Sequence, residues 1–309
     1  MLVSRRTSLA ESFMLMGTVI TVRVVGEMGA HKMRDGIDRA LEAMRQVEQT
    51  CSRFDEQSEL RQLTRTTGQE VAVSPVLFRA LEVACEVAAL TDGVFDPTVG
   101  RRLELLGFNR HYLTGETISS DFAQDSSATF RDITLLEDGF RVRLEKPLGL
   151  DLGAVAKGLA VDVAARELSG YEGFAIDAGG DVFVGGIDPH GSVWQVGVEN
   201  PLAPTGLLTT LRVTNSAVCT SGSYKRRSAR HVGSHHLIDA RSGESPNELM
   251  SCTVVAPQTI LADVAATAAF LLGEARALDF ISGLGLDALI VTQDGTVRQT
   301  AGMEGYRHD

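Results

Sequence analysis

Cysteine is scarce in this chain, with four residues among 309. Cys51, Cys85, Cys219 and Cys252 stand far apart and form no C-x-x-C pair, so neither a zinc site nor a thioredoxin-type motif is indicated. Dense runs of lysine or arginine are also missing, and 29 basic residues face 40 acidic ones, for a net charge of −11. Because phosphate backbones are bound through clustered positive charge, we do not expect nucleic acid as a partner.

A long hydrophobic run is equally absent. The most apolar stretch, ILADVAATAAFLL at 260–272, is too short and too polar to span a bilayer, so we expect no membrane insertion. The opening residues, MLVSRRTSLAESF, lack the continuous apolar segment of a signal peptide, which favours a cytoplasmic protein. With 44% apolar and 22% charged residues, the composition is that of an ordinary globular chain.

The apolar periodicity predicts a mixture of helices and strands. An alternating stretch at 14–26 predicts a first strand, and apolar spacings of three and four predict a helix over 31–51. Ser74 followed by Pro75 indicates another helix start, and residues 150–170 are expected to pass from strand into helix. Further strand-like segments lie at 130–145, 174–186, 194–201, 207–220, 235–240, 251–256 and 287–300, several of them around glycine turns.

These strand-like segments follow one another through hairpin turns instead of alternating strictly with helices. This order favours an α+β fold with mostly antiparallel pairing over a doubly wound fold. The polar, aperiodic stretch near 110–130 predicts a loop or an insertion between two lobes.

The apolar segment at 260–272 has polar side chains only at Asp263 and Thr267. At four residues' separation both lie on one face of a helix. A buried carboxylate without a partner is costly, so Asp263 requires a basic side chain, backbone N–H groups or a hard cation such as Mg²⁺ or Ca²⁺. A structural role, in which Asp263 caps a neighbouring loop, is the alternative.

Glycines bracket a lysine in the segment LGAVAKGLA. Gly153 and Gly158 flank Lys157 near an expected helix start, where free backbone N–H groups and a cation could hold a phosphate. A tight strand-to-helix turn explains the same pattern equally well. The segment matches neither the Walker A loop nor the dinucleotide-binding motif.

Two further polar stretches carry possible chemistry. IDAGGDVFVGG places Asp177 and Asp181 around a glycine turn, and TSGSYKRR at 220–227 combines hydroxyl and basic groups that could contact an anion or simply be solvated. HVGSHHLIDA contains three histidines, at 231, 235 and 236, before Asp239. Neutral imidazole there suits metal ligation or a general base, and a structural role is the alternative.

Taken together and in this order, eight stretches resemble the ApbE-type flavin transferase family, the FAD:protein FMN transferases. They are MGTVITV (16–22), CSRFDEQSEL (51–60), TDGVFDPTVG (91–100), LDLGAVAKGLAVD (150–162), AIDAGGDVFVGG (175–186), TSGSYKRR (220–227), HHLIDARSG (235–243) and ADVAATAAFLLG (262–273). The resemblance implies that residues 1–309 form a single ApbE-like domain of two intertwined lobes, with FAD between them. It also implies that Mg²⁺ touches the FAD pyrophosphate, and that FMN passes to a Ser or Thr hydroxyl of an acceptor protein with release of AMP.

The same resemblance assigns roles to individual residues. It implies that Asp263, Thr267 and the carbonyl of Ala156 are metal ligands, and that His236 is the catalytic base, with His235 as its competitor. The implied FAD contacts are Met16, Phe54, Val94, Phe95, Asp96, Gly153, Lys157, Leu159 and Ile238, although core packing is the alternative for the apolar ones. Ala240 departs from the proline that the family often has at this point.

Two other activities are compatible with such a site. Water in place of the acceptor hydroxyl would make the protein an FAD pyrophosphatase that yields FMN and AMP, and loss of turnover would leave a non-catalytic FAD-binding protein. The identity of the acceptor protein and the oligomeric state do not follow from the sequence.

Overall fold

The computed structural model describes residues 6–119, 124–203, 205–224, 228 and 233–307. Within them, the largest element is an eight-stranded sheet in the order β1-β2-β6-β7-β10-β11-β12-β13. Its strands are β1 (Thr7–Leu15), β2 (Thr18–Gly26), β6 (Gly173–Ala178), β7 (Asp181–Gly186), β10 (Ser216–Gly222), β11 (Leu249–Ala256), β12 (Asp287–Thr292) and β13 (Val297–Gln299). Every neighbouring pair is antiparallel, which confirms the expected fold class.

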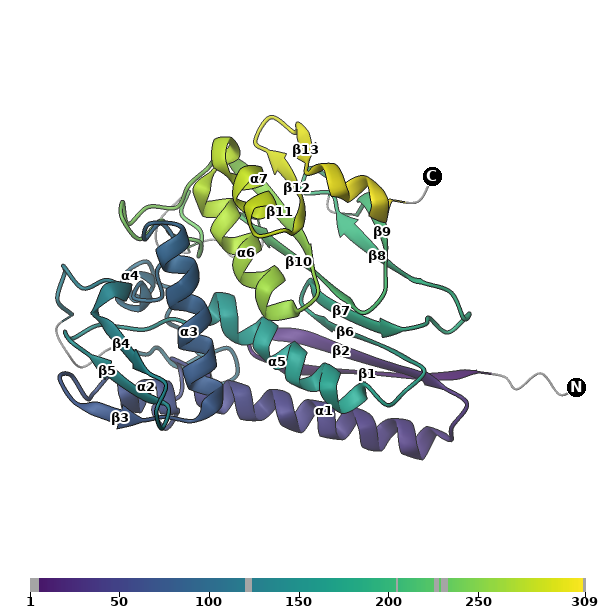
Figure 1. Cartoon of the computed structure of the whole chain (residues 1–309), viewed down its shortest axis with the longest axis horizontal. Coiled ribbons are helices and arrows are strands. Elements are labelled where there is room, and N and C mark those ends of the chain that lie inside the picture. The colour runs from purple at the N-terminus through teal and green to yellow at the C-terminus, as the bar shows by residue number, and fades with distance from the viewer. Residues whose placement is uncertain (1–5, 120–123, 204, 225–227, 229–232, 308–309) are drawn as a thin grey trace, which may run out of the picture.

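Helices cover one face of this sheet (Figure 1). They are α1 (Ala30–Cys51), α5 (Gly153–Leu168), α6 (Thr259–Leu272) and α7 (Glu274–Gly283). The opposite face packs against a two-stranded sheet of β8 (Trp194–Glu199) and β9 (Leu207–Val213), and against η2 (Ala301–Tyr306). Successive side chains of β2 point to opposite faces of the sheet, so this strand packs on both layers. Ile20, Val22 and Val24 face the helices, while Val25 joins the apolar cluster around Trp194 on the other face.

A smaller group of elements lies beside the sheet, at the left of Figure 1. It consists of α2 (Glu59–Leu63), α3 (Pro75–Leu90), α4 (Gly100–Leu105), η1 (Phe130–Asp132) and a three-stranded sheet of β3 (Glu70–Ala72), β4 (Ile133–Leu136) and β5 (Arg141–Leu144). One hydrophobic core includes residues of this group together with those of the helices and the large sheet. The two-lobed division stays a prediction.

Most of the expected helices and hairpins form. The helices predicted at 31–51, after Ser74 and at 260–272 are α1, α3 and α6, and the hairpins predicted at 174–186 and 287–300 are β6–β7 and β12–β13. The hairpin expected in 130–145 is β4–β5. In the described part of 110–129 the chain forms neither helix nor strand, as expected. No helix of the described residues is long and apolar enough to cross a bilayer.

Four expectations are wrong. The segment 207–220 is not one strand, because β9 ends at Val213 and β10 begins at Ser216, after Asn215 with a φ of 48°. Residues 14–26 are not one strand, because the chain reverses at Met16 and Gly17, whose φ angles are 53° and 72°. Paired left-handed residues make a tight hairpin turn, and the alternating segment before it forms β1. No strand precedes α5 in 150–152, and 235–240 forms no strand, with bridge residues only at His235 and at Asp239, which pairs with Glu244.

Candidate active site

A cleft of about 500 Å³ opens where α5 and α6 meet the hairpin turns of the large sheet. This volume lies in the range of small-molecule sites. Among the residues predicted from the sequence, the lining includes Met16, Phe54, Phe95, Asp96, Gly153, Ala156, Lys157, His236, Ile238, Asp263 and Thr267. Val94 and Leu159 do not line it, because both side chains are buried in the hydrophobic core. The carbonyl oxygen of Val94 accepts a hydrogen bond of 3.0 Å from the amide of Ala240, which ties two loops together.

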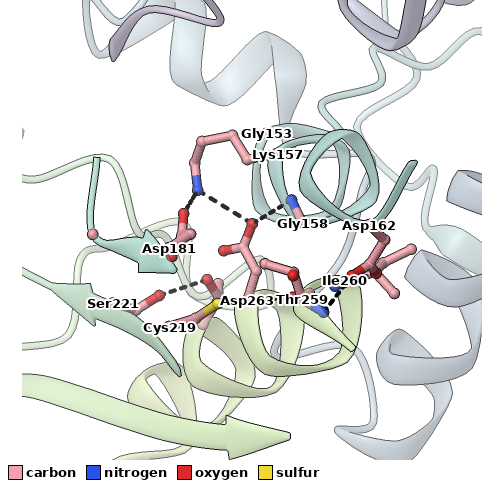
Figure 2. Close-up of polar contacts among 12 residues, drawn as sticks. Gly153, Lys157, Gly158, Asp162, Asp181, Cys219, Ser221, Thr259, Ile260 and Asp263 are labelled. Carbon is pink, nitrogen blue, oxygen red and sulfur yellow. Dashed lines mark hydrogen bonds and ion pairs between the residues drawn. The ribbon is translucent and has the colours of Figure 1, made fainter. Parts of the chain in front are cut away.

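Lys157 lies between two buried carboxylates in this cleft (Figure 2). Its Nζ contacts Oδ2 of Asp181 on β7 and lies 3.2 Å from Oδ2 of Asp263 on α6. The amide of Gly158 donates a further hydrogen bond of 3.2 Å to the same oxygen of Asp263. Among the described residues, Asp263 is therefore satisfied by an ammonium and a backbone N–H, both from helix α5.

The charges in this cluster do not balance. Burial, followed by the neighbouring charge of Asp181, raises the pKa of Asp263 to about 7, against the opposing effect of Lys157. Burial also lowers the pKa of Lys157, but the two carboxylates outweigh it and raise that pKa above its usual value. With both carboxyl groups ionised, one ammonium leaves the cluster one negative charge in excess.

Asp181 is a site residue that the sequence pattern did not distinguish from Asp177. Asp177 and Asp181 flank the same glycine turn, yet only Asp181 lines the cleft, and its exposure is 4%. Asp177 is exposed and accepts a hydrogen bond of 2.9 Å from Gly180, as expected for a turn residue. The turn itself is held close to β2, since a Cβ added at Gly179 would lie 2.1 Å from Oγ1 of Thr18.

The crossing of α5 and α6 places the lysine opposite Asp263. Gly158 makes the crossing possible, because a Cβ there would approach the carbonyl oxygen of Thr259 and Cα of Ile260 to 2.6 Å. One turn later, Asp162 accepts hydrogen bonds of 2.7 Å and 3.0 Å from the amides of Thr259 and Ile260 (Figure 2). A carboxylate of one helix thus caps the first turn of the other.

Thr267 lies one turn after Asp263 on the face of α6 that borders the cleft, as the spacing predicted. Its hydroxyl is 2.8 Å from the hydroxyl of Ser221 on β10. Ser221 belongs to the stretch 220–227, whose three basic residues at 225–227 lie outside the described residues. The described part therefore contributes hydroxyl groups to the cleft.

The two adjacent histidines have different surroundings. His236 lines the cleft, and its ring lies edge-on to Phe108 at 6.4 Å. His235 is 2% exposed and packs against Phe270. Nε2 of His235 is 2.9 Å from the carbonyl oxygen of Pro246, while its Nδ1 accepts from the amide of Leu237 at 3.3 Å. Both ring nitrogens of His235 are thus used in the local fold, and the third histidine, at 231, lies outside the described residues.

Asp96 lines the cleft, and its carboxyl group also accepts hydrogen bonds that stabilise its own loop. Its Oδ1 accepts from the amide and the hydroxyl of Thr98, each at 2.8 Å, and its Oδ2 accepts from the amide of Phe130 at 2.9 Å. Burial raises the pKa of Asp96 despite these hydrogen bonds. The carboxyl group therefore fixes the segment that carries Phe95 into the cleft.

Of the aromatic rings at the rim of the cleft, Phe54 was predicted from the sequence, whereas His111 and Tyr112 were not. Arg53 lies over the ring of Phe54 at 4.2 Å, and Phe54 meets His111 edge-on at 6.3 Å. His111 in turn stacks on Tyr112, with ring centroids 5.2 Å apart. His111 and Tyr112 come from the loop predicted at 110–130, where the sequence shows no periodicity that could have placed them beside a site.

The structure thus defines an α+β protein with an antiparallel sheet, a helical layer and, beside them, a cleft of small-molecule size lined by both charged and apolar residues. Comparison with known proteins gives the family: residues 16–290 match the model of the ApbE family, and the chain belongs to that family.

Its curated relatives include the FAD:protein FMN transferase of Treponema pallidum, 29% identical over 94% of this chain and 86% of that protein. The FAD:protein FMN transferase of Rhodobacter capsulatus is 30% identical over 95% of this chain, which spans 57% of that protein's length. Among solved structures, the ApbE protein of Thermotoga maritima matches with a TM-score of 0.85 at 27% identity, covering 98% of this chain and all of the other. The flavin transferase ApbE of Vibrio cholerae matches with a TM-score of 0.82 at 25% identity, covering 97% of this chain and 99% of the other.

Proposed function

We propose that this protein is a Mg²⁺-dependent FAD:protein FMN transferase, which moves FMN from FAD to a Ser or Thr hydroxyl of an acceptor protein and releases AMP. The observation that carries the proposal is the cleft, which joins His236 with the Lys157–Asp181–Asp263 cluster and Thr267. His236 can act as a base, and the carboxylate oxygen atoms of Asp181 and Asp263 lie around the Lys157 ammonium. Such an arrangement suits a phosphoryl-type transfer. The names of the relatives agree with this reaction.

The residues around Asp263 fit a magnesium ion. Mg²⁺ takes oxygen ligands, and Asp263 and Thr267 offer a carboxylate and a hydroxyl from one face of α6. A site whose two carboxylates exceed its single ammonium repels a pyrophosphate unless a further cation is present. Mg²⁺ would be held by Asp263, Thr267 and the carbonyl of Ala156, and it would offset the charge on the transferring phosphate.

Few side chains would ligate this ion. Among the described residues, no three His, Cys, Asp or Glu side chains gather as a metal site. Mg²⁺ commonly keeps waters and substrate phosphates as ligands next to one or two carboxylates, so such a gathering is not required. The proposal therefore assigns part of the coordination to FAD itself.

His236 is the proposed base. It accepts the proton of the acceptor hydroxyl, whose oxygen then bonds to the phosphorus on the FMN side of the pyrophosphate. The bond between this phosphorus and the bridging oxygen breaks, and AMP leaves with the electron pair. The position of His236 in the cleft supports this role, whereas His235 is held in the core by Pro246 and Phe270.

The other proposed FAD contacts divide by position. Met16, Phe54, Phe95, Asp96, Gly153, Lys157 and Ile238 line the cleft and remain proposed contacts. The side chains of Val94 and Leu159 lie in the hydrophobic core, which favours a packing role for both.

Product analysis tests the proposed reaction. The purified protein is incubated with FAD and Mg²⁺, with and without a candidate acceptor protein, and FMN and AMP are quantified by chromatography. The proposal predicts AMP release that depends on the acceptor, with FMN bound to the acceptor. Free FMN and AMP in equal amounts without acceptor would show a pyrophosphatase, and a stable FAD complex with no product would show a binding protein.

A further inference from the structure

Glu48, near the end of α1, joins two separate rims of the cleft. Its Oε1 accepts a hydrogen bond of 2.8 Å from the amide of Met16 and one of 2.9 Å from the phenol of Tyr112. Met16 belongs to the β1–β2 turn and Tyr112 to the loop after α4. All three residues line the cleft. A single carboxylate therefore fixes the distance between two segments that are remote in sequence.

The turn at Met16 needs such a partner. Met16 has a φ of 53°, in the left-handed region that residues other than glycine rarely adopt. A residue in such a conformation persists when its surroundings hold it, and here the amide of that same residue is the donor to Glu48. The contact thus acts on the backbone of a residue in the cleft lining.

Tyr112, the second hydrogen-bond partner of Glu48, belongs to a loop whose aromatic rings line the cleft. Nδ1 of His111 accepts from the amides of Leu113 and Thr114, at 3.2 Å and 3.3 Å, and this makes a compact turn. The His111 ring stacks on Tyr112 and meets Phe54 edge-on. The phenol that reaches Glu48 therefore sets the position of a stacked pair of rings on the rim.

We infer that Glu48 is a positioning residue that holds the Met16–Gly17 turn and the His111–Tyr112 loop at the spacing needed to bind FAD. The inference rests on the proposed function only for the identity of the ligand. Glu48 acts through the two rims and takes no part in proton transfer.

The surroundings of the phenol agree with this geometry. Burial, followed by the hydrogen bond and the charge of Glu48, raises the pKa of Tyr112 to about 12. The backbone amides of Met16 and Gly17 act in the opposite direction, which places the phenol against the hairpin turn itself.

The test compares Glu48→Ala and Glu48→Gln with the unchanged Glu48 by titration of FAD in Mg²⁺, all in a His236→Ala background, where the proposed base is absent and turnover is blocked. Loss of both hydrogen bonds in Glu48→Ala is expected to weaken FAD binding about tenfold. Glu48→Gln keeps an oxygen that can accept both bonds, so it should recover most of that loss. Tyr112→Phe, which retains the ring, should weaken binding two- to threefold, roughly the effect of one hydrogen bond.

Glu42→Ala is the matched control, since Glu42 lies on the exposed side of α1 and its carboxylate is 3.5 Å from Arg45. Circular dichroism and thermal melts verify that each variant is folded. In steady-state assays Glu48→Ala should raise KM for FAD much more than it lowers kcat. In a spectrophotometric titration near 295 nm, Glu48→Ala should also shift one tyrosine to lower pH, and this shifting component should be absent from Tyr112→Phe.

Unchanged FAD affinity in Glu48→Ala, or an equal loss in Glu48→Gln, would overturn the inference. A fall in kcat with unchanged affinity would also overturn it, because Glu48 would then act in the chemistry. FAD affinity is measured without turnover, so a protein that binds FAD but transfers no FMN would contradict the proposed function and leave this test intact.

Discussion

At the scale of single residues, two neighbouring histidines have different surroundings. His236 borders the cleft, while both ring nitrogens of His235 are occupied in the fold. We expect His236→Ala to bind FAD normally and to lose FMN transfer by roughly a hundredfold or more, the contribution of a general base. His235→Ala should lower the melting temperature but keep transfer activity per folded molecule. Equilibrium FAD titration and initial transfer rates measure both effects, and the reverse pattern would show that the base is misassigned.

Asp263 offers a second test at this scale. Asp263→Asn removes one of two carboxylates that share a single ammonium, and Lys157 keeps its contact with Asp181. We expect Mg²⁺-dependent turnover to fall roughly a hundredfold or more, while the melting temperature stays unchanged or rises. Turnover assays over a Mg²⁺ series and thermal melts provide the measurement. Full activity at the same Mg²⁺ concentration would exclude Asp263 as a ligand.

Some site residues could be predicted from the sequence alone, and others could not. Asp263, Thr267 and Lys157 stand out locally, because a carboxylate in an apolar helix and a lysine between glycines are unusual. Asp181 cannot be told from Asp177 within its turn, and Glu48 does not stand out at all, since each acts through partners that are remote in sequence. The role of an apolar residue such as Leu159 cannot be read from the sequence, because a side chain that packs in the core and one that touches a ligand give the same apolar periodicity.

At the scale of elements, the α5–α6 crossing positions the charged cluster. Gly158→Ala would force a Cβ within 2.6 Å of the backbone of α6, which should destabilise the fold by about 1–3 kcal/mol. Activity should fall too, because Lys157 and Asp263 face each other across this crossing. Gly170→Ala is the control, since no atom lies within 4 Å of its added Cβ. Denaturant unfolding and transfer rates give the comparison, and equal stability of the two variants would contradict the close packing.

Elements with strong local signals were predictable from the sequence. α1 and α3 have clear apolar periods, and Ser74 accepts a hydrogen bond from Leu77 as an N-cap should. The β1–β2 turn was missed because its residues, Met16 and Gly17, resemble strand residues within an alternating run. Only the pairing of the two strands reveals the reversal.

At the scale of the whole molecule, the cleft depends on segments that the chain order separates. The β1–β2 turn, the loop after α4, the start of α5, the β6–β7 turn and one face of α6 all contribute lining residues. The antiparallel order of the large sheet brings the two hairpin turns together, and α5 and α6 of the helical layer line the site beside them. Local patterns predicted the fold class, whereas the loop contributions required the tertiary structure.

The most direct measurement is the intact mass of an acceptor protein after incubation with this protein, FAD and Mg²⁺, with a parallel sample in EDTA. The account predicts an acceptor heavier by one FMN unit in the Mg²⁺ sample and unmodified in EDTA. An acceptor modified equally in EDTA would contradict the role of the metal. AMP and free FMN without any modified acceptor would contradict the transferase.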